Sequence, residues 1–188
     1  MASTSTTFLN GYSSRKDVLG LLSFPDMLDP KAMFCRFYSY VQGNWGTLDL
    51  QFQCKSLTVR IDEKKGYKGW CVLGKNGEIA DISGSSPPRI SQIPGAGLDV
   101  MNPYGYVEAI KRIAGELYVC GYGRQVYKLV EEQWVAISED ILTRERAIGF
   151  FDIDGLDAKR IYAVGWKGEI YQYDGKTWHK DDSPTTAH

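Results

Sequence analysis

Three stretches of the sequence repeat one pattern, and this repeat limits the fold more than any other feature of the chain. The stretches are WCVLGKNGEIADI, LYVCGYGRQVYKL and IYAVGWKGEIYQY, and they superpose on Gly74, Gly121 and Gly165. Successive glycines are 47 and 44 residues apart. Further residues recur at fixed distances after the glycines, namely Ile79, Val126 and Ile170 at five residues, and Trp134 and Trp178 at thirteen. Unrelated glycine-rich hairpins would not reproduce both distances.

Each repeat is preceded by an alternating segment, so that one unit consists of four short strands. The alternating segments are SLTVRID, VEAIKRI and IGFFDID. Four short strands with a period in the mid-forties are typical of a β-propeller blade. The second strand, YVCG or YAVG, is apolar on both faces, as expected where each blade packs between two neighbours. The tryptophan of the outermost strand is expected to pack over the next blade. The composition agrees with an all-β fold, since the 12 Tyr, 5 Trp and 20 Gly favour strands and tight turns.

The N-terminal part lacks the repeat and is predicted to differ. Residues 1–32 are expected to form an arm, with a disordered ASTST stretch and a short helical turn in SRKDVLGLLSF that Pro25 and Pro30 end. MFCRFYSYV and TLDLQFQC, on either side of QGNWG, predict a β-hairpin. The predicted all-β, propeller-like domain is therefore 33–188, with the hairpin at 33–54 and blades at about 57–93, 107–138 and 147–181.

Three blades and a hairpin leave the closure of the ring open, because closed propellers have about 4–8 blades. The final SPTT resembles a link into a further blade. The hairpin could close the ring, a second copy of the chain could complete it as a homo-oligomer, or the chain could be one part of a longer protein.

Charge and hydropathy exclude several classes of function. The net charge is −1, whereas nucleic-acid-binding domains carry a basic excess. The N-terminus lacks the basic-then-apolar pattern of a signal peptide, and no apolar run approaches membrane-spanning length. We therefore expect a cytoplasmic protein that binds neither nucleic acid nor membranes.

The sequence holds no recognisable catalytic, cofactor or metal motif. GKNGE and GYGRQV lack the spacing of phosphate-binding loops, and no nucleophile motif accompanies His179. The four cysteines include no CxxC pair, and FFDIDGLDAKR has no glutamate where a calcium loop requires one. Cys71 and Cys120 lie in apolar strand patterns and are predicted to be buried thiols. Whether Cys35 and Cys54 form a disulfide is left open. We predict a non-catalytic protein without cofactor or metal.

The turns between second and third strands are the best candidates for function. In a propeller these turns and the links between blades open on the same face. Asn76-Gly77 consists of residue types that turns favour for backbone reasons, whereas Tyr122 and Trp166 are residue types with no such preference for turns. Tyr, Trp and Arg are enriched at protein–protein hot spots, although exposed single aromatic residues are also common. The predicted partner-binding residues are Lys75, Asn76, Tyr104, Tyr106, Tyr122, Arg124, Trp166 and Lys167.

The second and third repeats also resemble a known family. LYVCGYGRQVYKLVEEQWVAIS and IYAVGWKGEIYQYDGKTWHKDDSPTT are similar to bacterial propeller repeats related to the photosystem II assembly factor Ycf48 and to WD40/YVTN-type blades. The resemblance covers about residues 57–186. It implies an interaction module, such as an immunity protein (antitoxin) that neutralises a toxin delivered by a contact-dependent or type VI secretion system. Two alternatives stay open: a carbohydrate-binding, lectin-like propeller, and a scaffold component that supplies part of a ring.

Overall fold

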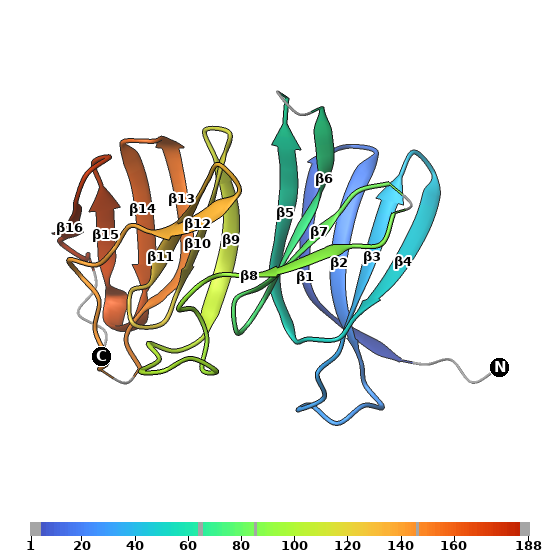
Figure 1. The fold of residues 1–188 in the computed structure, drawn as a ribbon, viewed down its shortest axis with the longest axis horizontal. Helices are drawn as coiled ribbons and strands as arrows, with labels where there is room; N and C mark the ends of the chain where they lie inside the picture. Colours follow the sequence, from blue (N-terminus) through green and yellow to red (C-terminus); the bar gives the residue numbers. More distant parts are fainter. Residues whose placement is uncertain (1–4, 64–65, 85, 146, 185–188) are drawn as a thin grey trace.

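The computed structural model describes residues 5–63, 66–84, 86–145 and 147–184, and these residues form four antiparallel sheets of four strands each (Figure 1). Each sheet consists of four consecutive strands. The first sheet holds β1 (Thr6–Arg15), β2 (Val18–Pro25), β3 (Cys35–Val41) and β4 (Asn44–Leu50), and the second β5 (Cys54–Asp62), β6 (Tyr67–Gly74), β7 (Glu78–Ile82) and β8 (Arg89–Gln92). The third holds β9 (Val107–Ile113), β10 (Glu116–Gly121), β11 (Val126–Val130) and β12 (Gln133–Ala136), and the fourth β13 (Phe150–Asp157), β14 (Arg160–Gly165), β15 (Ile170–Tyr173) and β16 (Trp178–Asp181). The all-β, propeller-like fold predicted from the repeat is therefore confirmed.

The first sheet corrects the prediction of an N-terminal arm. Residues 1–4 lie outside the described residues, but β1 and β2 pair with each other, and β2 pairs with β3 of the predicted hairpin. A helical turn would have brought Val18, Leu21 and Leu22 to one side. In strand β2 instead, Val18 and Leu22 are buried against the second sheet, whereas Leu21 lies on the opposite face. The segment is a strand because the second sheet gives it an apolar surface on which to pack.

Three apolar cores join the four sheets in sequence order. The core between the first and second sheets includes Phe37 and Trp70, whose rings meet edge to face at 5.7 Å. Cys71, Leu73 and Val119 belong to the core between the second and third sheets. The core between the third and fourth sheets is the most aromatic, with Tyr118, Phe150, Tyr171 and Trp178. As expected for a stack of repeats, each sheet is stabilised chiefly by its neighbours.

The sheets form an open arc. Among the described strands, the extensive contacts between sheets join only successive sheets, and they centre on the innermost strands β1, β5, β9 and β13. Ion pairs between neighbouring innermost strands support the same arrangement, from Lys55 to Glu108 at 2.8 Å and from Lys111 to Asp152 at 3.4 Å. In Figure 1 the first sheet extends to the right of the molecule and the fourth to the left.

The outermost tryptophans pack in the opposite direction to the one predicted. Trp178 on β16 packs with Phe150 against the third sheet, which precedes it, and its indole Nε1 donates to the carbonyl of Ile137 at 2.8 Å. Trp134 likewise packs into the core shared with the second sheet. The reason is register: Trp178 pairs with Tyr173, which pairs with the buried Ile161, and paired residues share a face.

All four cysteines are buried free thiols. Cys35 lies on β3 and Cys54 on β5, so they belong to different sheets rather than to opposite arms of one hairpin. Burial raises the pKa of the Cys71 and Cys120 thiols well above its ordinary value, which keeps both groups protonated and unreactive. Within the described ranges, no helix is long and apolar enough to cross a membrane, and no group of three or more His, Cys, Asp or Glu side chains is placed to hold a metal ion.

Candidate partner-binding face

A repeated backbone hydrogen bond brings the predicted turns to one end of the sheets. The residue that follows each repeat glycine donates its N–H to the segment before the innermost strand of its own sheet: Lys75 to the carbonyl of Gln53 at 2.9 Å, Tyr122 to that of Tyr106 at 2.8 Å, and Trp166 to that of Gly149 at 3.1 Å. We call this end of the molecule the loop end. It comprises the turns 75–77, 122–125 and 166–169 and the links 93–106 and 137–149, and it lies at the bottom of Figure 1.

The links between sheets fasten the loop end into one continuous surface. The N–H of Val107 donates to the carbonyl of Lys75 at 3.0 Å, which ties the third sheet to a turn of the second. The N–H of Gly123 donates to the carbonyl of Ile148 at 2.8 Å and joins the third sheet to the link before the fourth. Gly123 has φ +67°, and a Cβ there would lie 2.7 Å from that of Tyr104, so the turn requires glycine on both counts. These contacts hold the turns rigidly relative to one another.

Three aromatic side chains line up at this end and form what we call the aromatic row. The ring centroids of Tyr122 and Phe151 are 6.4 Å apart in an edge-to-face arrangement, and those of Phe151 and Trp166 are 5.1 Å apart. Phe151 and Trp166 remain 44% and 39% exposed. The row therefore combines two predicted residues with Phe151, which sequence reasoning missed. The doublet Phe150-Phe151 was the available signal, because a bulge between Phe150 and Asp152 leaves Phe150 buried and Phe151 exposed.

Arg124 lies in the predicted turn, but its guanidinium is occupied inside the protein. Its Nε and Nη2 donate to both carboxylate oxygens of Glu169 at 3.0 and 2.6 Å, and Nη1 donates to the carbonyl of Ile141 at 3.3 Å. The guanidinium also lies 5.2 Å from the ring centre of Tyr171. The hydrogen bonds to Glu169 raise the pKa of Arg124. Arg124 thus links the turns of the third and fourth sheets.

Asn76 is also a structural residue rather than an exposed one. Its side-chain Oδ1 accepts the N–H of Leu98 at 3.1 Å, and its carbonyl accepts Gln92 Nε2 at 2.6 Å. Asn76 is buried, whereas its neighbour Lys75 is partly exposed and places its Nζ 4.9 Å from the ring centre of Tyr106. Of this pair of predicted residues, only Lys75 is presented to solvent.

A cation–π contact and an ion pair border the aromatic row. The Arg144 guanidinium lies 4.6 Å from the ring centre of Tyr104, and its Nη2 donates to the Tyr104 hydroxyl at 3.3 Å. Lys167 Nζ lies 3.4 Å from a carboxylate oxygen of Glu145. Tyr104, Tyr106, Tyr122, Trp166, Lys75 and Lys167 are thus gathered at one end with solvent-accessible surface. The structure gives the loop end an aromatic centre with a polar border, which is the usual anatomy of a protein–protein contact.

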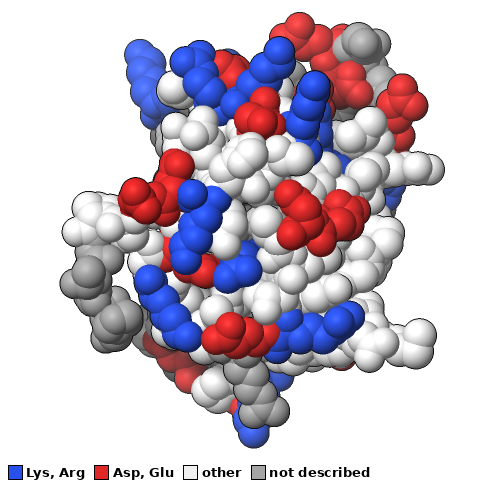
Figure 2. All heavy atoms as spheres, turned by 90° about the vertical axis from the view of Figure 1, so that its left-hand side faces the viewer, with Lys and Arg blue, Asp and Glu red and all other residues white. Residues whose placement is uncertain are grey.

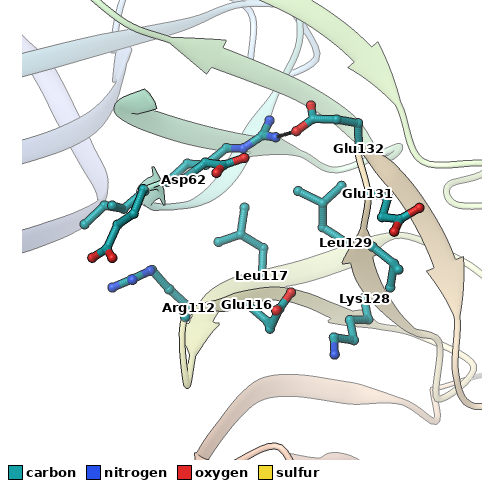
Figure 3. Close-up of a pocket in the computed structure, with 13 residues that line it drawn as sticks. Asp62, Arg112, Glu116, Leu117, Lys128, Leu129, Glu131 and Glu132 are labelled. Atoms are coloured by element: carbon teal, nitrogen blue, oxygen red, sulfur yellow. Dashed lines mark hydrogen bonds and ion pairs between the residues drawn. The ribbon is translucent and has the colours of Figure 1, made fainter. Parts of the chain in front are cut away.

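The end of the sheets opposite the loop end holds a cleft of about 880 Å³ between the second and third sheets (Figure 3). Its walls carry charges of both signs, including Asp62, Arg112, Glu116, Lys128 and Glu131. At its edge, Arg60 Nη1 donates to Asp81 at 2.7 Å, and Nη2 donates to Glu132, as drawn in Figure 3. This network joins two sheets, and the lining of the cleft holds five acidic and three basic side chains.

The surface charges are interspersed in the same way. In Figure 2, which faces the left side of Figure 1, basic and acidic groups lie beside one another and no field of a single sign covers the view. This mixture of signs on the face in view agrees with the net charge of −1.

The fold and the loop end together define a β-propeller-like repeat protein with an open arc of four sheets and a row of partly exposed aromatic side chains at one end. Solved propellers show the same fold. The WD40 propeller domain of Doa1 superposes with a TM-score of 0.59 at 12% identity, covering 93% of this chain and 56% of that one. Ycf48 from Cyanidioschyzon merolae superposes with a TM-score of 0.50 at 13% identity, covering 90% of this chain and 65% of that one.

A curated protein is similar in sequence as well. The chain is 40% identical over 117 residues to the immune protein Tsi7 of Pseudomonas aeruginosa, and the match includes 60% of this chain. The matched part spans 38% of the length of Tsi7. No family model matches the chain.

Proposed function

We propose that this chain is an immunity protein that binds a toxin protein through the loop end and blocks it. The aromatic row carries the proposal, because Tyr122 and Trp166 each contact Phe151 and all three side chains are partly exposed. Tyrosine and tryptophan in such a setting are the residues that most often dominate binding energy at protein interfaces. The similarity to a protein named as an immune protein supports a toxin as the partner over a sugar or a scaffold.

The proposed mechanism is occlusion and requires no chemistry from this chain. The exposed rings would contact an apolar patch on the toxin, while Lys75, Lys167 and Arg144 at the border would select its charge pattern. We further propose that the chain acts in the cytoplasm of the cell that makes it, without enzymatic activity of its own, and that the toxin is a type VI secretion effector.

A binding experiment tests the proposal with a candidate toxin chosen from the reading frames that neighbour the gene for this chain. The two proteins are co-expressed, purified as a complex and measured by biolayer interferometry. The double variant Tyr122→Ala/Trp166→Ala should weaken binding roughly 30-fold or more, since truncation of one hot-spot residue costs about 2 kcal/mol or more. Ile90→Ala removes an apolar side chain that is more exposed than Trp166, from the outermost strand of the second sheet, and should leave binding unchanged. Equal affinity of the double variant and the wild type would exclude the loop end.

A further inference from the structure

A cleft of about 400 Å³ lies between the first and second sheets, at the end of the sheets opposite the loop end. It is equivalent in position to the larger cleft between the second and third sheets, because Trp70 in its lining and Leu117 in the other both lie four residues before a repeat glycine. The two clefts differ in charge. The larger one is lined by five acidic and three basic side chains, whereas the described residues that line the smaller one include Arg15 and Lys68 but no acidic side chain. We call the smaller one the basic cleft.

The floor of the basic cleft is apolar and partly aromatic. The rings of Phe37 and Trp70, which meet edge to face, both belong to it, and the remaining buried apolar residues of the lining are Val18, Val59 and Ile82. Trp70 is held directly against strand β2, because a Cβ at Gly20 would lie only 2.7 Å from Trp70 Cζ3. The floor therefore offers a preformed surface on which an apolar group can be removed from water.

The polar groups of the basic cleft are hydrogen-bond donors that the protein itself leaves available. The indole N–H of Trp70 has no acceptor within the described part of the chain, although only 8% of the residue is exposed. Lys68 lies two residues earlier on the same face of β6, is exposed, and takes part in no ion pair within the described ranges. Arg15 lies 3.6 Å from Asp17, and their side chains are 52% and 37% exposed. So long and exposed a contact holds the guanidinium only weakly.

We propose that the basic cleft binds a small organic acid, with an apolar body between the first and second sheets and a carboxylate that faces Lys68 and Arg15. The cleft is as large as the smaller ligand sites of proteins, which measure about 300–1,000 Å³ and combine an apolar lining with a few polar groups. Contact with Phe37 and Trp70 supplies affinity, and the two cations select the charge, since they attract a carboxylate and repel an amine. The site is remote from the aromatic row and does not depend on the proposed toxin.

Isothermal titration calorimetry tests the charge preference on the 188-residue chain with ligands that share one apolar body. Indole-3-propionate, indole-3-propionamide and tryptamine carry a negative, no and a positive charge. The acid should bind at least about fivefold more tightly than the amide, as expected when a ligand charge gains a partly exposed partner, and the amine should bind most weakly. Octanoate and octylamine repeat the comparison with an aliphatic body, and the tighter of the two acids shows whether the cleft prefers a ring or a chain.

Three variants place the ligand in the basic cleft. Lys68→Gln should weaken binding of the tighter acid about fivefold and leave the amide unchanged, whereas the control Lys128→Gln, in the larger cleft, should change neither. Ser39→Phe adds a ring to the lining from β3 and should abolish binding of both acids, with circular dichroism showing that the chain remains folded. The proposal is overturned if neither acid binds or if the amide or an amine binds as tightly as its acid. It is also overturned if Lys68→Gln, or a folded Ser39→Phe, binds like the wild type.

Discussion

Tyr118 and Tyr162 occupy the same position of the repeat, three residues before Gly121 and Gly165, but the fold treats them differently. Tyr118 lies in the core between the third and fourth sheets and is 1% exposed, whereas Tyr162 lies on the open face of the fourth sheet and is 39% exposed. The comparison teaches that the repeat specifies a strand with two apolar faces, and that the neighbouring sheets decide which residues become core.

The largest expected effect comes from truncating these two tyrosines. Tyr118→Ala should lower the free energy of unfolding by about 3–5 kcal/mol, because it leaves a large cavity in a well-packed core. Tyr162→Ala should cost about 0.5 kcal/mol or less in dilute solution, as expected for a surface position. Urea denaturation of both variants measures the difference. If the two losses were equal, the open face of the fourth sheet would be covered in solution.

The second comparison concerns the basic residues of two equivalent turns. Both Arg124 and Lys167 adopt positive φ, but the Arg124 side chain is 18% exposed and pairs with Glu169, whereas Lys167 is 54% exposed beside Glu145. Arg124→Met should cost about 3 kcal/mol, since it leaves a buried carboxylate without its partner. Lys167→Met should cost about 0.5 kcal/mol. Thermal unfolding with matched methionine variants tests this, and a tolerated Arg124→Met would mean that the pair does not join the turns.

The smallest expected effect is a pH dependence in the turn between β15 and β16. The Asp174 carboxylate accepts the N–H groups of Thr177 and Lys176, and these bonds, with His179, lower its pKa to about 2. A pKa lowered by folding stabilises the native state above about pH 4, and this contribution is lost as pH falls toward 2. Asp174→Asn should therefore lower the melting temperature slightly at pH 7 and not at pH 2. The corresponding turn of the third sheet, Glu131–Glu132, lacks this arrangement of backbone donors to an aspartate, and Glu131→Gln serves as the control.

The repeat predicted the second, third and fourth sheets because each contains the glycine that ends a central strand. The first two strands of the first sheet escaped prediction because β2 ends at Pro25 without such a glycine and β1 is largely exposed, so neither strand shows a marked alternation. At the loop end, the turns that the sequence singled out do lie together, but the sequence pattern treats every polar residue there as available. Asn76 and Arg124 are occupied by Leu98 and Glu169, which are distant in sequence, and no local pattern reveals such partners.

The sequence alone determined the period, the strands of three sheets, and the end of each sheet at which aromatic side chains occupy turns. These properties depend on residues close in the chain, whose spacing expresses backbone geometry directly. Tertiary structure decided the rest: that residues 6–25 complete a first sheet, that Trp178 packs on the preceding sheet, that Phe151 joins Tyr122 and Trp166, and that two faces of the arc stay open. Each of these depends on which segments, distant in the sequence, pack against one another. Whether a side chain is buried is therefore set by its packing partner and not by its own segment.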